Sequence, residues 1–149
     1  MTNYGLVKFD IWDCAGQEKF GGLRESYYIG ADRAILTFDV TSRITYKNIP
    51  NWYKDVCRIC KNVPVVLVGN KVESNCRKVE TKDIVFHKGK YMQYCELSAK
   101  SGYQYEKPFI LLLRMLAQNN TIKLLSEPIP QPEEVLLTED EIKQVVEYE

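Results

Sequence analysis

The sequence lacks any long apolar run, and this absence restricts what the chain can be. No stretch approaches the roughly 20 apolar residues that a membrane-spanning helix needs, and the first five residues hold no apolar signal region. Since the five cysteines occur without a secretory signal, we expect free thiols in a reducing compartment rather than disulfides. We therefore expect no binding to membranes.

An excess of charge is also lacking, because 20 basic and 20 acidic residues cancel. The distribution is uneven, however. Residues 127–149 hold eight acidic groups against Lys143 alone, which gives −7 there and +7 in residues 1–126. The lysines of residues 1–126 are dispersed and form no single basic stripe, so we expect no direct binding of nucleic acid.

The apolar pattern predicts a sheet with helices between its strands. Four segments have the composition of buried strands: 7–12, 34–40, 63–69 and 92–97. The second and third are nearly continuous apolar runs, which is typical of strands covered on both faces. Helical patterns follow at 48–60, 81–87 and 109–116. Strands that alternate with helices predict an α/β fold with a parallel sheet.

The C-terminal part has a different composition. Prolines stand at every second position from Pro128 to Pro132, which favours an extended linker. The segment Thr138–Glu141 then fits a capping box ahead of a short acidic amphipathic helix. We therefore divide the chain into a domain at 1–126 and a proline-containing linker with an acidic C-terminal helix at 127–149.

The strongest chemical signal follows the first predicted strand, where Trp12 to Glu18 reads Trp-Asp-Cys-Ala-Gly-Gln-Glu. An Asp at the carboxyl end of a strand, here Asp13, can hold the shell of a Mg²⁺ ion. A following Gly, here Gly16, lets its backbone N–H approach a terminal phosphate. The adjacent Gln17 can orient an attacking water. Each could be an ordinary turn residue, but the ordered set indicates a phosphate site.

Two further motifs stand at the carboxyl ends of the third and fourth predicted strands. A loop that reads guanine needs an amide, a lysine stem over the ring, and a carboxylate for N1–H and the amino group. Asn70, Lys71 and Glu73 supply these in order. After the fourth strand, Ser98 and Ala99 supply a small residue whose backbone N–H can donate to the guanine carbonyl. Each motif alone is weak, but their order and their place at strand ends argue against a chance match.

This series of motifs, Asp-x-x-Gly-Gln, Asn-Lys-x-acid and Ser-Ala-Lys, resembles that of the Ras-like small GTPases. Within them the chain looks most like the Ran-type GTPases of nuclear transport. The segments that carry the closer resemblance are 18–24, 27–29, 39–43, 45–52 and 84–87. The likeness runs from about Asn3 to about Pro132. It implies a P-loop NTPase-like, Ras-like parallel sheet flanked by helices.

The resemblance also implies ligands, roles and partners. The ligands are GTP or GDP with Mg²⁺. On the phosphate side, Asp13 would serve the Mg²⁺ shell through water, Ala15 and Gly16 would lie at the nucleotide, and Gln17 would place the hydrolytic water. The guanine pocket would consist of Asn70, Lys71, Glu73, Ser98, Ala99 and Lys100. Partners would be importin- and exportin-type transport receptors, an exchange factor and a GTPase-activating protein, in the nucleus and cytoplasm.

Three departures from the family pattern matter, and the smallest is Cys14, which stands where the family usually has Thr. No Gly-x-x-x-x-Gly-Lys-Ser/Thr motif occurs in the 149 residues. We interpret the sequence as truncated at its N-terminus, without the central first strand between 7–12 and 34–40. Its removal leaves a gap of about 9.6 Å, two strand spacings, so either the two flanking strands pair anew or their inner backbone edges stay unsatisfied. We also expect no GTP hydrolysis. In addition, Glu73 stands where the family has Asp, which is expected to weaken guanine binding by roughly 1–3 kcal/mol.

Three functions are compatible with the sequence. The chain is a GTP-binding switch in nucleocytoplasmic transport, as the resemblance implies. Alternatively, it is a non-catalytic module that competes for transport receptors or for the exchange factor. The third alternative is a truncated gene product that does not fold stably. A measurable affinity for guanine nucleotides favours the first of these.

Overall fold

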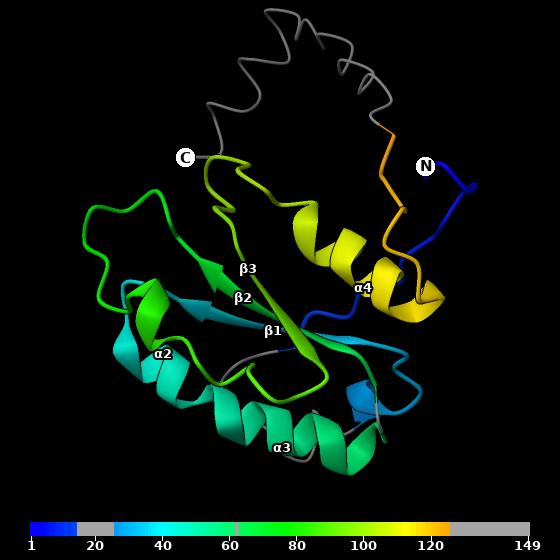
Figure 1. Cartoon of the computed structure of the whole chain (residues 1–149). Coiled ribbons are helices and arrows are strands. Elements are labelled where there is room, and N and C mark those ends of the chain that lie inside the picture. The colour runs from blue at the N-terminus through cyan, green and yellow to red at the C-terminus, as the bar shows by residue number, and fades with distance from the viewer. Residues whose placement is uncertain (15–25, 62, 126–149) are drawn as a thin grey trace, which may run out of the picture.

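The described strands form one parallel sheet (Figure 1). The computed structural model describes residues 1–14, 26–61 and 63–125. The strands lie in the order β1 (Ala34–Asp39), β2 (Val65–Asn70) and β3 (Met92–Glu96). Because β2 pairs in parallel with both neighbours, each connection must cross over the sheet. The predicted α/β fold with a parallel sheet flanked by helices is confirmed.

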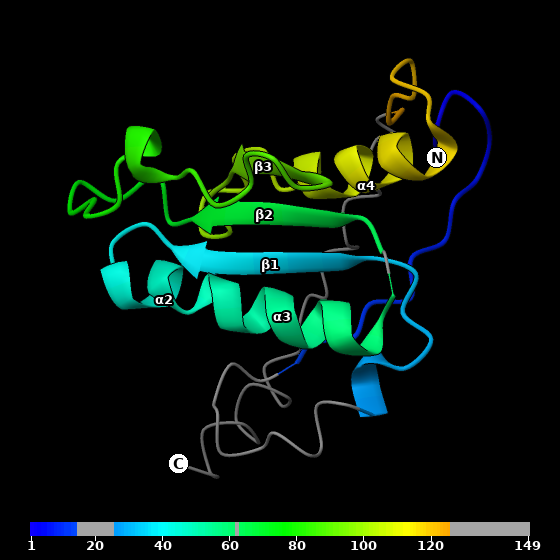
Figure 2. The same ribbon diagram turned by 60° about the horizontal axis from the view of Figure 1, so that its bottom comes forward.

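Helices cover both faces of the sheet (Figure 2). On one face, α2 (Arg43–Lys47) and α3 (Ile49–Ile59) pack against β1. On the other face, α4 (Lys107–Ala117) packs against β2 and β3. A single 3₁₀ turn, η2 (Thr81–Asp83), lies between β2 and β3 in the chain. None of the helices in the described residues is long and apolar enough to cross a bilayer.

The central strand β2 contributes to two hydrophobic cores. Val65 and Leu67 pack in the core on the α3 side of the sheet. Val66 and Val68 pack with Leu112 in the core on the α4 side. The four β2 side chains are all fully buried. The prediction of a strand covered on both faces is therefore confirmed for β2.

The prediction of coverage on both faces is wrong for β1. Leu36 and Phe38 are buried in the core on the α3 side, whereas Ile35 and Thr37 on the opposite face are exposed. The helix on that face, α4, packs mainly over β2 and β3 and leaves this part of β1 uncovered by described elements.

The strand predicted at 7–12 is also wrong, because this segment is described and forms no strand. Ring contacts hold it instead. Phe9 meets Phe109 of α4 with 5.3 Å between ring centroids, and the exposed Trp12 meets Tyr27 at 5.8 Å. A strand needs a neighbour that completes its backbone hydrogen bonds, and the sheet of the described residues ends at β1.

The helix predicted over 81–87 is reduced to the single turn η2. The helix stops because two backbone N–H groups that would continue it bond to a side chain instead. The N–H groups of Val85 and Phe86 both donate to the hydroxyl of Tyr46, at 3.0 and 3.2 Å. Ile84 is meanwhile buried in the core on the α3 side. Tertiary contacts therefore replace a second helical turn.

The N-terminal residues pair with the segment that follows α4. Asn3 N–H donates to the carbonyl of Lys123 at 3.2 Å, and Leu125 N–H donates to the carbonyl of Met1 at 3.0 Å. Figures 1 and 2 both place the N-terminus beside the end of α4. The linker and helix predicted at 127–149 lie outside the described residues.

Candidate functional site

The two predicted base-reading loops leave the sheet at the carboxyl ends of neighbouring strands. Residues 70–73 begin at the end of β2, and residues 98–100 follow β3. The parallel register pairs Gly69 with Glu96, and Leu97 N–H donates to the Gly69 carbonyl at 2.9 Å. In open α/β sheets, ligands bind in the crevice outside this edge.

A side-chain hydrogen bond joins the two loops directly. The amide oxygen Oδ1 of Asn70 accepts from the backbone N–H of Lys71 at 2.7 Å and from the backbone N–H of Ala99 at 3.0 Å. The Ala99 N–H is the group predicted to donate to the guanine carbonyl. Guanine would therefore compete with the Asn70 oxygen for this N–H.

Lys71 is held in place by an acidic residue that the sequence analysis did not single out. Lys71 has left-handed backbone geometry, with φ of 70°, and its Nζ pairs with Oδ2 of Asp39 at 2.7 Å. The other oxygen of Asp39 accepts from the N–H and the hydroxyl of Thr41, at 2.7 and 2.6 Å. Burial alone would raise the pKa of Asp39, but the hydrogen bonds from Lys71 and Thr41 outweigh it and hold this pKa below its usual value.

Asp39 could have been found from its position, because it is the last residue of β1 and so stands at the same sheet edge as Asn70. The ion pair with Asp39 also raises the pKa of Lys71, so this lysine stays charged. Both carboxylate oxygens of Asp39 are engaged, and this fixes where the lysine ammonium lies.

Glu73 and Ser98 also connect the two loops. A hydrogen bond from the Ser98 side chain is the main reason why the pKa of Glu73 lies below its ordinary value, and the nearby Lys100 lowers it further. Ser98 is fully buried. Its N–H donates to the carbonyl of Tyr103 at 3.0 Å, and its hydroxyl accepts from the N–H of Ser101 at 3.0 Å. The carboxylate expected to read guanine is thus tied to the turn that contains Ser98.

Gly69 allows the close packing at the start of the first loop. A Cβ atom at this position would lie 2.9 Å from the Tyr94 hydroxyl, 3.1 Å from Cγ1 of Val40 and 3.3 Å from Cζ of Phe38. A separation under 3.0 Å forces neighbouring atoms to move. A side chain at Gly69 would therefore force either the Tyr94 hydroxyl or the strand end that carries Asn70 to shift.

The phosphate side of the predicted site is described only in part. Asp13 is exposed and is the next-to-last residue of the first described segment. Ala15, Gly16 and Gln17 lie outside the described residues. Within residues 1–14, 26–61 and 63–125, no group of three or more His, Cys, Asp or Glu side chains could hold a metal ion. The described geometry therefore concerns recognition of the base.

Comparison with protein families gives one result that bears on this arrangement. A family model described as the Ras family matches residues 2–118, which is well over half of the chain. The matched range includes Asp13, both loops at the sheet edge and the whole of the described sheet.

Proposed function

Since the chain belongs to the Ras family of small GTPases, we propose that it recognises the guanine base of GDP or GTP through residues 70–73 and 98–100. Members of the family bind guanine nucleotides with Mg²⁺ and interact with exchange factors and GTPase-activating proteins. The observation that carries the proposal is the 3.0 Å hydrogen bond between Asn70 and Ala99, since it places two base-reading groups beside each other.

The chemistry of the groups at this edge fits guanine. The base presents acceptors at N7 and O6, and adenine instead presents a donor at its sixth position. The Asn70 amide and the Ala99 N–H supply donors for the guanine acceptors. The Glu73 carboxylate supplies an acceptor for N1–H and the amino group. Adenine would leave these groups mismatched, and buried mismatched polar groups are costly.

Lys71 would cover one face of the ring. Its side chain is 56% exposed, and its ammonium is tied to Asp39 at 2.7 Å. The aliphatic stem is therefore held in a fixed direction while remaining accessible to a flat apolar surface. In this account Asp39 directs the stem without contacting the base.

On the phosphate side we propose the roles that the family implies. Asp13, whose carboxylate is exposed, would hold the Mg²⁺ shell through water. Ala15 and Gly16 would lie at the phosphates, and Gln17 would orient the attacking water. The ion, when bound, would neutralise phosphate charge.

We also propose a role in nuclear transport, which the residues at 39–43, 45–52 and 84–87 support by their resemblance to Ran-type GTPases. Partners would be importin- and exportin-type receptors, an exchange factor and a GTPase-activating protein, and the protein would occur in the nucleus and cytoplasm. A pull-down of purified receptors with the 149-residue chain tests this. Binding that depends on added GTP supports a switch, binding that ignores nucleotide supports a competing module, and no binding contradicts the transport role.

Base recognition is tested by titrating the isotope-labelled chain with GDP and with ADP while following backbone amide resonances. The proposal predicts that GDP shifts the resonances of Lys71, Ser98 and Ala99 at lower concentration than ADP does. The sheet residue Leu67, buried away from both loops, serves as the internal control. Equal responses to the two nucleotides would contradict the proposal, because the phosphates are common to both.

A further inference from the structure

A cluster of four polar side chains borders the base-reading loops, and we call it the carboxylate clamp: Arg77, Thr81, Tyr94 and Glu96. Arg77 binds both oxygens of Glu96, since Nη1 donates to Oε2 at 3.1 Å and Nη2 donates to Oε1 at 2.5 Å. Oε1 also accepts from the hydroxyl of Tyr94 at 2.6 Å and from that of Thr81 at 3.1 Å. Glu96 is thus the centre of the clamp.

The ion pair of the clamp is largely shielded from solvent. The side chains of Arg77 and Glu96 keep only 23% and 24% of their exposure. The hydrogen bonds from Arg77 are the main cause that lowers the pKa of Glu96 to about 2, so this carboxylate stays charged near neutral pH. A bidentate hydrogen-bonded pair between arginine and a carboxylate is both strong and directional.

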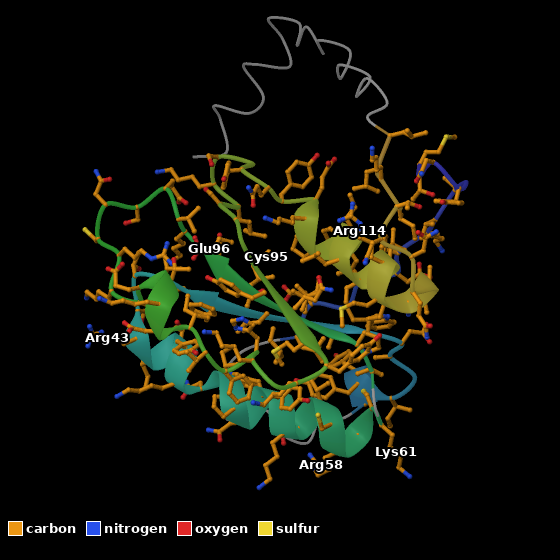
Figure 3. The ribbon with its side chains drawn as sticks, viewed as in Figure 1. Arg43, Arg58, Lys61, Cys95, Glu96 and Arg114 are labelled. Carbon is orange, nitrogen blue, oxygen red and sulfur yellow. The ribbon has the colours of Figure 1, made fainter. Side chains whose placement is uncertain are left out.

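The clamp connects the two parts of the chain that carry the loops. Glu96 is the last residue of β3 and stands two positions before Ser98. Arg77 stands four positions after Glu73, in the segment that leads to η2. Figure 3 shows Glu96 toward the end of the sheet from which the loops leave, far from Arg58 on α3.

The segment that carries Arg77 is also hydrogen-bonded to the chain just after β1, the strand on the opposite edge of the sheet from β3. The N–H groups of Lys78 and Val79 donate to the carbonyl of Val40, at 2.8 and 2.9 Å. Nε of Arg43 donates to the carbonyl of Lys78 at 2.9 Å. The segment after the first loop is therefore fixed to the end of β1, and Arg77 extends this support to β3.

We propose that the ion pair between Arg77 and Glu96 is a positioning device that sets the spacing between residues 70–73 and 98–100. The inference rests on the proposed recognition of guanine and assigns the clamp no contact with the base. Glu96 acts through Ser98, and Arg77 acts through Glu73. Groups held in the bound geometry before binding lose less conformational freedom when the ligand arrives.

The test measures amide hydrogen exchange in the full 149-residue chain. Glu96→Gln keeps the shape of the side chain and removes its charge. We expect exchange of the Val72 and Ala99 amides to accelerate at least about tenfold, because each bonds across the two loops. The Leu67 amide in the central strand should be unchanged. Arg58→Gln, which breaks an exposed ion pair with Asp55 on α3, is the matched control.

Thr81→Val provides a second variant, because Thr81 is exposed and its loss leaves the core intact. It removes one hydrogen bond to Glu96 and one from Arg77, so we expect about a threefold acceleration confined to the loops. This variant decides the question if Glu96→Gln does not fold. Acceleration that extends equally to Leu67 would show a general stabilising role and overturn the proposal, as would unchanged exchange in the loops.

A second readout separates this inference from the proposed function. In Glu96→Gln the preference for GDP over ADP should fall about tenfold, which corresponds to about 1.4 kcal/mol, while Arg58→Gln keeps it. If the unaltered chain shows no preference, guanine recognition is contradicted. Acceleration confined to the loops would still support the clamp as their spacer. A full preference retained in Glu96→Gln would overturn the positioning role.

Discussion

The side-chain oxygen of Asn70 and the backbone N–H of Ala99 lie 29 positions apart in sequence and form a 3.0 Å hydrogen bond. This contact joins the loop after β2 to the loop after β3. Both groups are ones that a guanine base would use, so the contact holds the base-reading groups together. It also means that changes at Asn70 affect the second loop.

Asn70→Ala is expected to weaken GDP binding by at least about tenfold, because it removes a donor to the base and the contact that ties the second loop to the first. Equilibrium dialysis of the variant against the unaltered chain measures the effect. Asn75→Ala is the matched control, since Asn75 is exposed in the same connection. If both variants lose the same affinity for GDP, the loop is sensitive to any substitution and the result does not support base recognition by Asn70.

Asp39→Asn is expected to weaken GDP binding about threefold to tenfold, because it removes the charge that directs Lys71. The unfolding midpoint should move little, since the pair is partly exposed at the sheet edge. Asp32→Asn, which alters an exposed carboxylate beside Arg33, is the control. An unchanged affinity for GDP would show that the lysine stem needs no counter-ion to cover the ring.

Gly69→Ala is expected to destabilise the fold by about 1–3 kcal/mol, the usual cost of overpacking. The added methyl group would meet the Tyr94 hydroxyl at 2.9 Å. Chemical denaturation measures the change in the free energy of unfolding. Gly30→Ala does not serve as a control, because Gly30 has a φ of 80°, where any side chain is strained. Because Tyr94→Phe also removes the hydrogen bond to Glu96, the effect of Gly69→Ala is measured again in the Tyr94→Phe background. It should be smaller there than in the unaltered chain, and an equal cost in both backgrounds would show that the strain lies elsewhere.

The stability of the fold should depend on pH through Glu96. Its pKa is about 2 in the folded protein against 4.5 for the free group, so the folded state favours the charged form. The contribution, about 1.5–3 kcal/mol for hydrogen bonds to a charged group, is complete above pH 4.5 and is lost as the pH falls toward 2.

Urea denaturation of the chain and of Glu96→Gln from pH 7 to pH 3 tests this dependence. The free energy of unfolding should fall more steeply below pH 4.5 in the unaltered chain than in the variant. Parallel curves would mean that other carboxylates account for the loss at acid pH and that Glu96 is not the dominant group.

Local pattern predicted the central part of the fold correctly. The apolar run predicted at 63–69 corresponds to β2, where five residues in a row are buried between helices on both faces. The run at 34–40 has a similar composition, yet Ile35 is exposed. Coverage of a strand depends on which helix packs over it, and the sequence of the strand alone does not determine this. The same holds for 7–12, whose pairing partner is not set by its own residues.

The base side of the site could be located from the strand ends, but its supporting contacts could not. Asp39 and Glu96 both end strands at the edge where the base-reading loops leave the sheet, although neither belongs to the three motifs that predicted the nucleotide site. Arg77 and Glu96 are 19 positions apart in the sequence, and charged residues are mostly exposed unless they are paired. Only the fold brings them together.

The most direct test of guanine recognition asks whether Glu73 reads the base. Its carboxylate should accept from N1–H and the amino group of guanine, whereas xanthine carries a carbonyl in place of that amino group. Glu73→Gln replaces one acceptor by a donor and keeps the length of the side chain. The measurement is the ratio of affinities for xanthosine diphosphate and GDP, in the unaltered chain and in this variant. We predict that the chain prefers GDP and that the variant shifts the ratio at least about tenfold toward xanthosine diphosphate. An identical ratio in both proteins would contradict the account.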